Sequence, residues 1–151
     1  MMNSKLNVCH MNVQSLCARN ISKFEELKQT FTESKIDIAC LSETWLNDTI
    51  TDSMIQINGF NLIRNDRNRH GGGMCIYFRK ELFCSVICKS IYTESNATNC
   101  KTEYLIVEVT IGNDRIMLAV YYNPPSNDCS DLLRCHFEEY SVTLQFHLLH
   151  R

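Results

Sequence analysis

Hydrophobic and polar residues follow two different periods along the chain, and each period predicts one kind of element. Apolar residues recur at helical spacing from Phe24 to Phe31, so residues 22–33 are predicted to form a helix. Residues 36–41 form a short, nearly continuous apolar run, which is typical of a buried strand. A first strand is predicted at residues 5–11. The order strand, helix, strand favours parallel pairing of the two strands through a right-handed crossover.

Beyond residue 58 the pattern mainly predicts strands. These are expected at residues 59–64, 73–78, 82–91, 103–111 and 115–122. Gly112-Asn113-Asp114 is turn chemistry, which predicts a hairpin between the last two strands. After them, residues 131–140 have helical spacing, and residues 142–148 alternate as a strand does. One strand–helix–strand unit followed by hairpin-connected strands favours an α/β fold with mixed sheets over a purely parallel one.

Length and composition narrow the class of protein. A chain of 151 residues suits one domain, and 44% hydrophobic with 21% charged residues excludes a disordered or fibrous chain. With a net charge of −2, the chain as a whole is not attracted to nucleic acid. Binding to nucleic acid would depend on a local stripe of basic residues. No run approaches the ~18 apolar residues of a membrane helix, and nothing near the N-terminus marks secretion. We therefore expect neither membrane association nor export.

The nine cysteines need a separate interpretation. Their number is odd, no Cys-x-x-Cys pair occurs, and no secretory signal supports a disulfide framework. Zinc sites usually contain two pairs of ligands, each pair closely spaced in the sequence, and the cysteines of this chain do not form two such pairs. We therefore expect reduced thiols, no disulfide-linked partner, and an intracellular location in the nucleus or cytoplasm.

Polar side chains follow the two early strands at the point where each strand ends. Asn12 and Gln14 follow the first strand, and Glu43 follows the second. Ligands of α/β sheets gather beyond the carboxyl ends of the strands, and if these strands are neighbours the three side chains meet at one edge. A carboxylate beside amide oxygens suits Mg²⁺. The alternative is a glutamate on a solvated loop.

Two further groups of residues have candidate chemistry. Tyr122 directly follows an apolar strand, where its phenol can hydrogen-bond a phosphate oxygen or simply pack on the prolines that follow. A cluster of basic residues surrounds residues 71–73, and it consists of Arg64, Arg67, Arg69, Arg79 and Lys80. It suits either a DNA backbone or an ordinary solvated loop. The glycines at 71–73 are interpreted as a turn that brings backbone into a crowded sheet.

Four segments are informative when they are taken together. They are Met-Asn-Val-Gln-Ser-Leu at 11–16, Leu-Ser-Glu-Thr-Trp-Leu at 41–46, Gly-Gly-Gly-Met-Cys-Ile-Tyr at 71–77 and Val-Tyr-Tyr-Asn-Pro-Pro at 120–125. In order, spacing and strand context they resemble the endonuclease/exonuclease/phosphatase superfamily. The version that they resemble stands at the start of non-LTR (LINE-like) retrotransposon polyproteins. The resemblance covers residues 5–125 and leaves residues 126–151 as a tail.

The resemblance implies a partial four-layered α/β sandwich that cleaves phosphodiester bonds with Mg²⁺ or Mn²⁺. It implies that Glu43 and Asn12 hold and orient the metal and that Tyr122 contacts a phosphate. Gln14 stands where the family often has Asp or Asn, which predicts a weaker set of ligands. Gln14, Arg67 and Arg69 are then expected to contact the DNA backbone.

The same family also has a Gly-Asp-x-Asn motif and a closing Ser-Asp-His motif, and neither occurs in these 151 residues. We therefore expect residues 1–151 to be a single incomplete domain, the N-terminal part of a DNA endonuclease, and inactive alone. DNA is the expected partner, with a reverse transcriptase domain in a longer polyprotein. Two alternatives remain. One is a non-catalytic nucleic-acid-binding remnant, and the other is a phosphoesterase of the same superfamily acting on a phospholipid or inositol phosphate.

Overall fold

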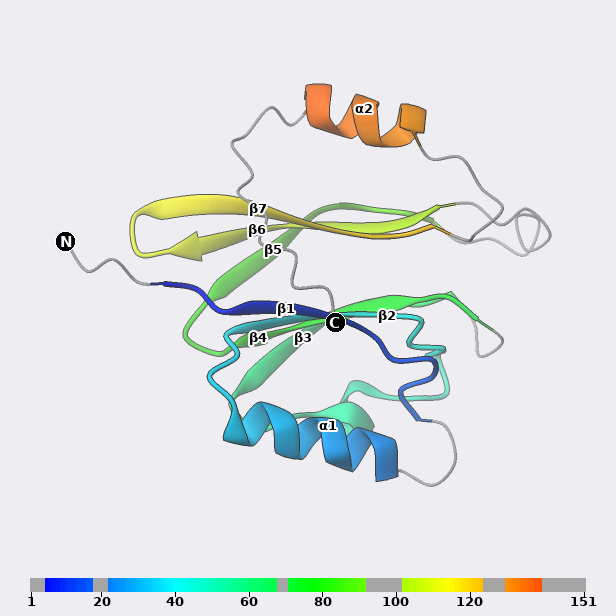
Figure 1. Cartoon of the computed structure of the whole chain (residues 1–151), viewed down its shortest axis with the longest axis vertical. Helices are drawn as coiled ribbons and strands as arrows, with labels where there is room; N and C mark the ends of the chain where they lie inside the picture. Colours follow the sequence, from blue (N-terminus) through cyan, green and yellow to red (C-terminus); the bar gives the residue numbers. More distant parts are fainter. Residues whose placement is uncertain (1–4, 18–21, 68–70, 92–101, 124–129, 140–151) are drawn as a thin grey trace. The chain divides into compact units, whose positions relative to one another are not determined.

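The computed structural model describes residues 5–17, 22–67, 71–91, 102–123 and 130–139. The chain divides into two compact units, Met1–Leu82 and Phe83–Arg151, and each is built on its own sheet (Figure 1). Among the described residues, no helix combines the length and the apolar character that a membrane crossing requires. The expected α/β class is confirmed.

The first unit contains a four-stranded mixed sheet in the order β1-β2-β4-β3. Its strands are β1 (Val8–Asn12), β2 (Ile38–Ser42), β3 (Phe60–Asn65) and β4 (Met74–Arg79). Strands β1 and β2 are parallel, with Asn12 opposite Ser42, while β4 is antiparallel to both of its neighbours. The parallel pairing predicted for the early strands is therefore confirmed, and it brings their carboxyl ends to one edge.

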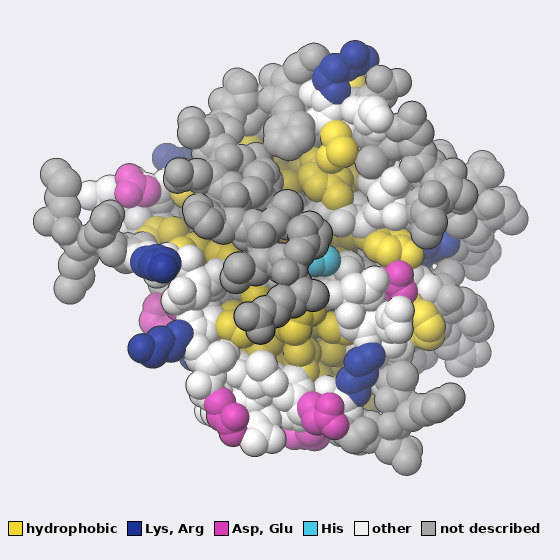
Figure 2. Space-filling view, viewed as in Figure 1, with side chains coloured by type: hydrophobic (Ala, Val, Ile, Leu, Met, Phe, Trp, Pro, Cys, Tyr) yellow, Lys and Arg dark blue, Asp and Glu magenta, His cyan; other side chains and the backbone are white. Residues whose placement is uncertain are grey.

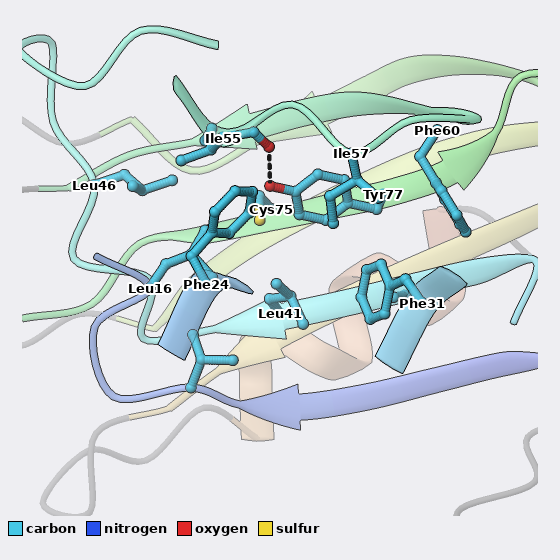
Figure 3. Packing of buried hydrophobic residues seen from close by; sticks show 12 residues of the cluster. Leu16, Phe24, Phe31, Leu41, Leu46, Ile55, Ile57, Phe60, Cys75 and Tyr77 are labelled. Atoms are coloured by element: carbon cyan, nitrogen blue, oxygen red, sulfur yellow. Dashed lines mark hydrogen bonds between the residues drawn. The ribbon is translucent and has the colours of Figure 1, made fainter. Parts of the chain in front are cut away.

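Helix α1 (Ser22–Glu33) connects these two strands and has the bounds that the sequence predicts. It packs on one face of the sheet through Phe24 and Phe31, which are buried in the main hydrophobic cluster (Figure 3). The ring of Phe31 lies 5.5 Å from that of Phe60 and 5.7 Å from that of Tyr77, measured between centroids. Aromatic contacts of this kind fix the helix against the sheet.

A short 3₁₀ helix, η1 (Asp52–Ile55), interrupts the connection between β2 and β3, and the sequence pattern does not predict it. Its last residue is fully buried, and the Ile55 carbonyl accepts a hydrogen bond of 2.7 Å from the Tyr77 hydroxyl (Figure 3). Burial raises the pKa of Tyr77, so the phenol stays protonated and remains a donor. This buried bond anchors the long connection to the centre of the sheet.

In its described residues, the second unit contains an antiparallel three-stranded sheet and one helix. The elements are β5 (Phe83–Lys89), β6 (Glu103–Ile111), β7 (Asp114–Tyr122) and α2 (Ser130–Glu139). Ile111 pairs with Asp114, which confirms the predicted hairpin and leaves a two-residue loop. Gly112 in that loop has φ +61°, a value that favours glycine. The strand predicted at residues 142–148 lies outside the described residues.

The cysteines within the described part of the chain are free thiols. Cys40 and Cys75 are buried, and burial raises the pKa of the Cys75 thiol, while it raises that of Cys84 to about 11. Thiols of this kind are poor nucleophiles at neutral pH. They act as small hydrophobic side chains in the two units.

Candidate active site

Two of the predicted site residues are in direct contact at the edge where β1 and β2 end. The Asn12 amide nitrogen Nδ2 donates to Oε1 of Glu43 at 3.3 Å. The Asn12 amide oxygen Oδ1 accepts from the backbone N–H of Gln14 at 3.2 Å. The parallel register causes this contact, because it aligns the last residues of the two strands.

These two contacts fix the orientation of the Asn12 amide. A backbone N–H can only donate and a carboxylate can only accept, so the amide oxygen must face Gln14 and the nitrogen must face Glu43. Asn12 therefore orients the Glu43 carboxylate. Among the described residues, no hydrogen bond involves the second oxygen of Glu43, Oε2. The half-buried Glu43 thus has one oriented oxygen and one that is available to a ligand.

The backbone around this contact is strained. In the described part of the chain, the non-glycine residues with positive φ are Gln14 (42°), Ser15 (74°), Glu43 (54°) and Trp45 (54°). All of them lie in the segments that follow β1 and β2. A left-handed conformation costs an ordinary residue about 1–2 kcal/mol. Such conformations persist only where the surrounding structure holds them, and they cluster at functional sites.

Backbone hydrogen bonds between the two strained segments hold them together. The N–H of Ser15 donates to the Glu43 carbonyl at 2.8 Å, and that of Leu16 donates to the Thr44 carbonyl at 2.9 Å. The segment that carries Asn12 and the segment that carries Glu43 therefore form one hydrogen-bonded structure beyond the ends of the strands.

The triple-glycine segment supports the other side of this structure. The N–H of Thr44 donates to the Gly73 carbonyl at 3.2 Å, and the N–H of Trp45 donates to the Gly72 carbonyl at 3.0 Å. Gly73 has φ +79°, and a Cβ placed on it would lie 2.9 Å from Oγ1 of Thr44. The predicted close approach of backbone at these glycines is therefore present at Gly73.

Gln14 and Tyr122 have different places in the structure. Gln14 contributes its backbone N–H to the site, and its residue is exposed. Tyr122 is the last residue of β7 in the second unit, where it is half-buried and pairs with Glu103. The phosphate contact assigned to Tyr122 stays a prediction.

Arg64 of the basic cluster stabilises the first unit through contacts within that unit. Its guanidinium donates to the carbonyls of Asn47 and Ile50 at 3.1 and 2.7 Å. It also pairs with Asp52 at 2.7 Å and with Asp66 at 2.6 Å. With its side chain only 14% exposed, Arg64 ties the connection after β2 to strand β3.

Arg79 is also engaged within the first unit. Its guanidinium lies 4.5 Å from the centroid of the Phe60 ring and donates to the carbonyls of Ile36 and Ser34. In the view of Figure 2, the Lys and Arg side chains of described residues are seen at separate places, with Asp and Glu side chains among them. The DNA-backbone contact assigned to Arg67 and Arg69 stays a prediction. Arg67 is half-buried, and Arg69 lies outside the described residues.

Comparison with known proteins yields structures and no sequence relative. No protein-family model matches the chain, and no curated protein matches it. Several solved structures, however, superpose over most of it. TDP2 from D. rerio, complexed with single-strand DNA product, matches with a TM-score of 0.64 at 18% identity, over 92% of this chain and 56% of that chain.

Two further solved structures also match most of this chain at low sequence identity. The endonuclease domain of TRAS1, a telomere-specific non-LTR retrotransposon, has a TM-score of 0.55 at 15% identity, over 90% of this chain and 54% of that chain. The human Nocturnin catalytic domain with bound sulfate has a TM-score of 0.55 at 14% identity, over 90% and 59%. All three have the endonuclease/exonuclease/phosphatase fold. This chain has the same fold. It spans a little over half the length of the structures it matches.

The donor atoms at this site of the endonuclease/exonuclease/phosphatase fold suit a hard divalent cation. Glu43 offers a carboxylate oxygen, and the Asn12 amide oxygen retains a second lone pair. Mg²⁺ takes one or two protein carboxylates and completes its shell with water and substrate phosphates. Structural zinc sites are built mainly from Cys sulfur and His nitrogen, whereas Glu43 and Asn12 offer oxygen. The described residues contain no group of three or more His, Cys, Asp or Glu that could hold a metal, so Glu43 would be the one carboxylate ligand among them. The residues therefore fit Mg²⁺ or Mn²⁺.

Lys23 also contacts the segment that carries this site, and the sequence pattern does not predict it. Lys23, at the start of α1, donates from its ammonium Nζ to the carbonyls of Val13 and Gln14. Nothing in the local sequence distinguishes it from the other lysines of the chain, because a lysine in the first turn of a helix normally points into solvent. Only the tertiary contact identifies Lys23.

Proposed function

We propose that this chain supplies the metal-holding half of the active site of a DNA endonuclease of the retrotransposon type, which hydrolyses phosphodiester bonds with Mg²⁺ or Mn²⁺. The observation that carries the proposal is the Asn12–Glu43 contact on strained backbone at the ends of two parallel strands. The likeness to the TRAS1 endonuclease domain and the four segments that resemble retrotransposon endonucleases support the choice of substrate.

We assign a role to each candidate residue. Glu43 would hold the cation through Oε2, and Asn12 would keep the carboxylate in the required orientation by donating to Oε1. When bound, the cation neutralises the charge that develops on the phosphate and orients the reacting oxygens. Tyr122 hydrogen-bonds a phosphate oxygen, and Gln14, Arg67 and Arg69 contact the DNA backbone.

The proposed chemistry also needs groups that these 151 residues do not contain. In the family that the segments resemble, the Asp of Gly-Asp-x-Asn activates the attacking water, and the His of Ser-Asp-His stabilises the phosphate. Neither motif occurs in the sequence. A general base and a phosphate-stabilising acid each contribute typically 10²–10⁴-fold to the rate. We therefore propose that the 151 residues bind the cation and DNA together but do not cleave, and that a longer polyprotein with a reverse transcriptase domain is the natural context.

Replacing Glu43 with glutamine is expected to abolish the effect of Mg²⁺ on DNA binding. A divalent cation bound at Glu43 would neutralise phosphate charge and strengthen binding, so we expect Mg²⁺ to raise the affinity of the wild-type chain for a short DNA duplex several-fold. The measurement is fluorescence anisotropy at constant ionic strength, with and without Mg²⁺. The matched control is Glu81→Gln, which removes the same charge from an exposed residue and should respond to Mg²⁺ like the wild type.

Two outcomes would contradict the proposal. DNA binding that does not respond to Mg²⁺, or responds equally in Glu43→Gln, would favour a non-catalytic binding remnant. Binding of an inositol phosphate at concentrations at which DNA does not bind would favour the phosphoesterase alternative.

In the same samples, nicking of supercoiled plasmid should be equal in the wild type and Glu43→Gln. Nicking confined to chains with Glu43 would contradict the expected inactivity.

A further inference from the structure

Lys23 makes contacts that are unusual for a lysine at the start of a helix. Its ammonium donates to the carbonyl of Val13, and it also lies 3.3 Å from the carbonyl of Gln14. Lys23 is half-buried, and no ion pair between described residues includes it. Its charge is therefore directed at two backbone carbonyls of the strained segment that follows β1.

The Val13 carbonyl belongs to the same peptide unit as the N–H of Gln14. That N–H donates to the amide oxygen of Asn12 at 3.2 Å. Because a peptide unit is planar and its C=O and N–H point in opposite directions, the ammonium on one side fixes the direction of the hydrogen bond on the other. A cation at the carbonyl also polarises the peptide and strengthens the N–H as a donor.

A continuous series of contacts therefore leads from Lys23 to Glu43. The ammonium fixes the Val13–Gln14 peptide, the peptide N–H fixes the Asn12 oxygen, and the Asn12 nitrogen fixes Oε1 of Glu43. The two carbonyls that Lys23 contacts lie just before and at the first left-handed residue of the segment, Gln14. Without the ammonium, the Val13 carbonyl would lose this donor, and the Val13–Gln14 peptide would be held less firmly towards Asn12.

We propose that Lys23 is a positioning residue that preorganises the Asn12–Glu43 site for a divalent cation. The proposal rests on the proposed function of Glu43 as the cation ligand. Lys23 contacts neither Asn12 nor Glu43 directly and acts through the Val13–Gln14 peptide. Groups that orient metal ligands in this way typically change metal affinity 10–100-fold when they are removed.

Replacing Lys23 with methionine is expected to weaken Mn²⁺ binding by about tenfold, since methionine keeps the aliphatic stem and removes the charge and the donors. The matched control is Lys28→Met on the same helix, where the lysine is 41% exposed and pairs with Glu25 at 3.6 Å. An exposed pair contributes little, so this variant should bind Mn²⁺ like the wild type. Lys23→Arg keeps charge and donors and should restore most of the affinity. If Lys23→Met does not fold, Lys23→Gln is titrated in its place.

Amide hydrogen exchange in the metal-free chain provides a second readout that does not depend on the cation. Exchange at the N–H groups of Gln14, Ser15 and Leu16 should be faster in Lys23→Met and unchanged in Lys28→Met. Unchanged exchange at these amides, or Mn²⁺ affinity equal to that of the wild type, would overturn the proposal. If the wild-type chain binds no Mn²⁺, the proposed function fails, and the exchange rates alone then decide whether Lys23 holds the segment.

Discussion

Replacing Phe31 with alanine is expected to lower the free energy of unfolding of the first unit by about 3–5 kcal/mol. Phe31 is fully buried in the main hydrophobic cluster, and its ring contacts those of Phe60 and Tyr77 at centroid distances of 5.5 and 5.7 Å. The truncation removes both aromatic contacts and leaves a cavity between α1 and the sheet. A loss of this size is a large part of the 5–15 kcal/mol that stabilises a typical domain.

Denaturant unfolding followed by circular dichroism measures this loss. Phe83→Ala provides the matched control, because Phe83 is 67% exposed and its truncation should change the unfolding free energy by no more than about 0.5 kcal/mol. Equal effects of the two substitutions would contradict the placement of Phe31 between the helix and the sheet.

Replacing Gly73 with alanine is expected to destabilise the first unit by about 2–5 kcal/mol. About 1–2 kcal/mol comes from a φ of +79°, which an alanine adopts only with strain. The rest comes from a Cβ placed 2.9 Å from Oγ1 of Thr44 and 3.4 Å from the backbone nitrogen of Arg67. Because Thr44 is fully buried and follows Glu43 directly, relief of this contact must also displace the candidate site.

Gly59→Ala separates the two causes. Gly59 lies in the same unit with φ +83°, and a Cβ there would meet only the flexible end of Arg79, at 3.9 Å. We therefore expect Gly59→Ala to show the backbone cost of about 1–2 kcal/mol alone. Thermal or denaturant unfolding of both variants gives the comparison, and equal losses would mean that Gly73 is not sterically confined.

The sequence predicts those parts of the structure that depend on local periodicity. The bounds of α1 were predictable because Phe24 and Phe31 mark one apolar face. The adjacency of Asn12 and Glu43 was predictable because a strand–helix–strand unit makes neighbouring parallel strands, and the two residues lie at the carboxyl ends of those strands. The start of β1 was predicted three residues early. The backbone N–H of Asn7 donates to the Asp37 side chain at 2.8 Å, and strand pairing begins only after this residue.

The remaining features depend on tertiary contacts that periodicity does not contain. The charge pattern around residues 64–80 does not distinguish Arg64, which ties a loop to β3, or Arg79, which packs over a ring, from arginines that face solvent. The contact between Lys23 and the Val13–Gln14 peptide and the left-handed φ of Glu43 arise only when the elements have packed. Positive φ at a glutamate is rare enough that no sequence rule would assign it.

The most direct test of the central claim is to locate the bound cation on the chain. Mn²⁺ is titrated into the ¹⁵N-labelled 151-residue chain, and the paramagnetic loss of each amide signal is followed by NMR. We expect the earliest losses at residues 12–15 and 42–45, the two segments that Asn12 and Glu43 join, and we expect Glu43→Gln to abolish them. Losses centred on other residues, or the same losses in Glu43→Gln, would contradict a cation site at the ends of β1 and β2.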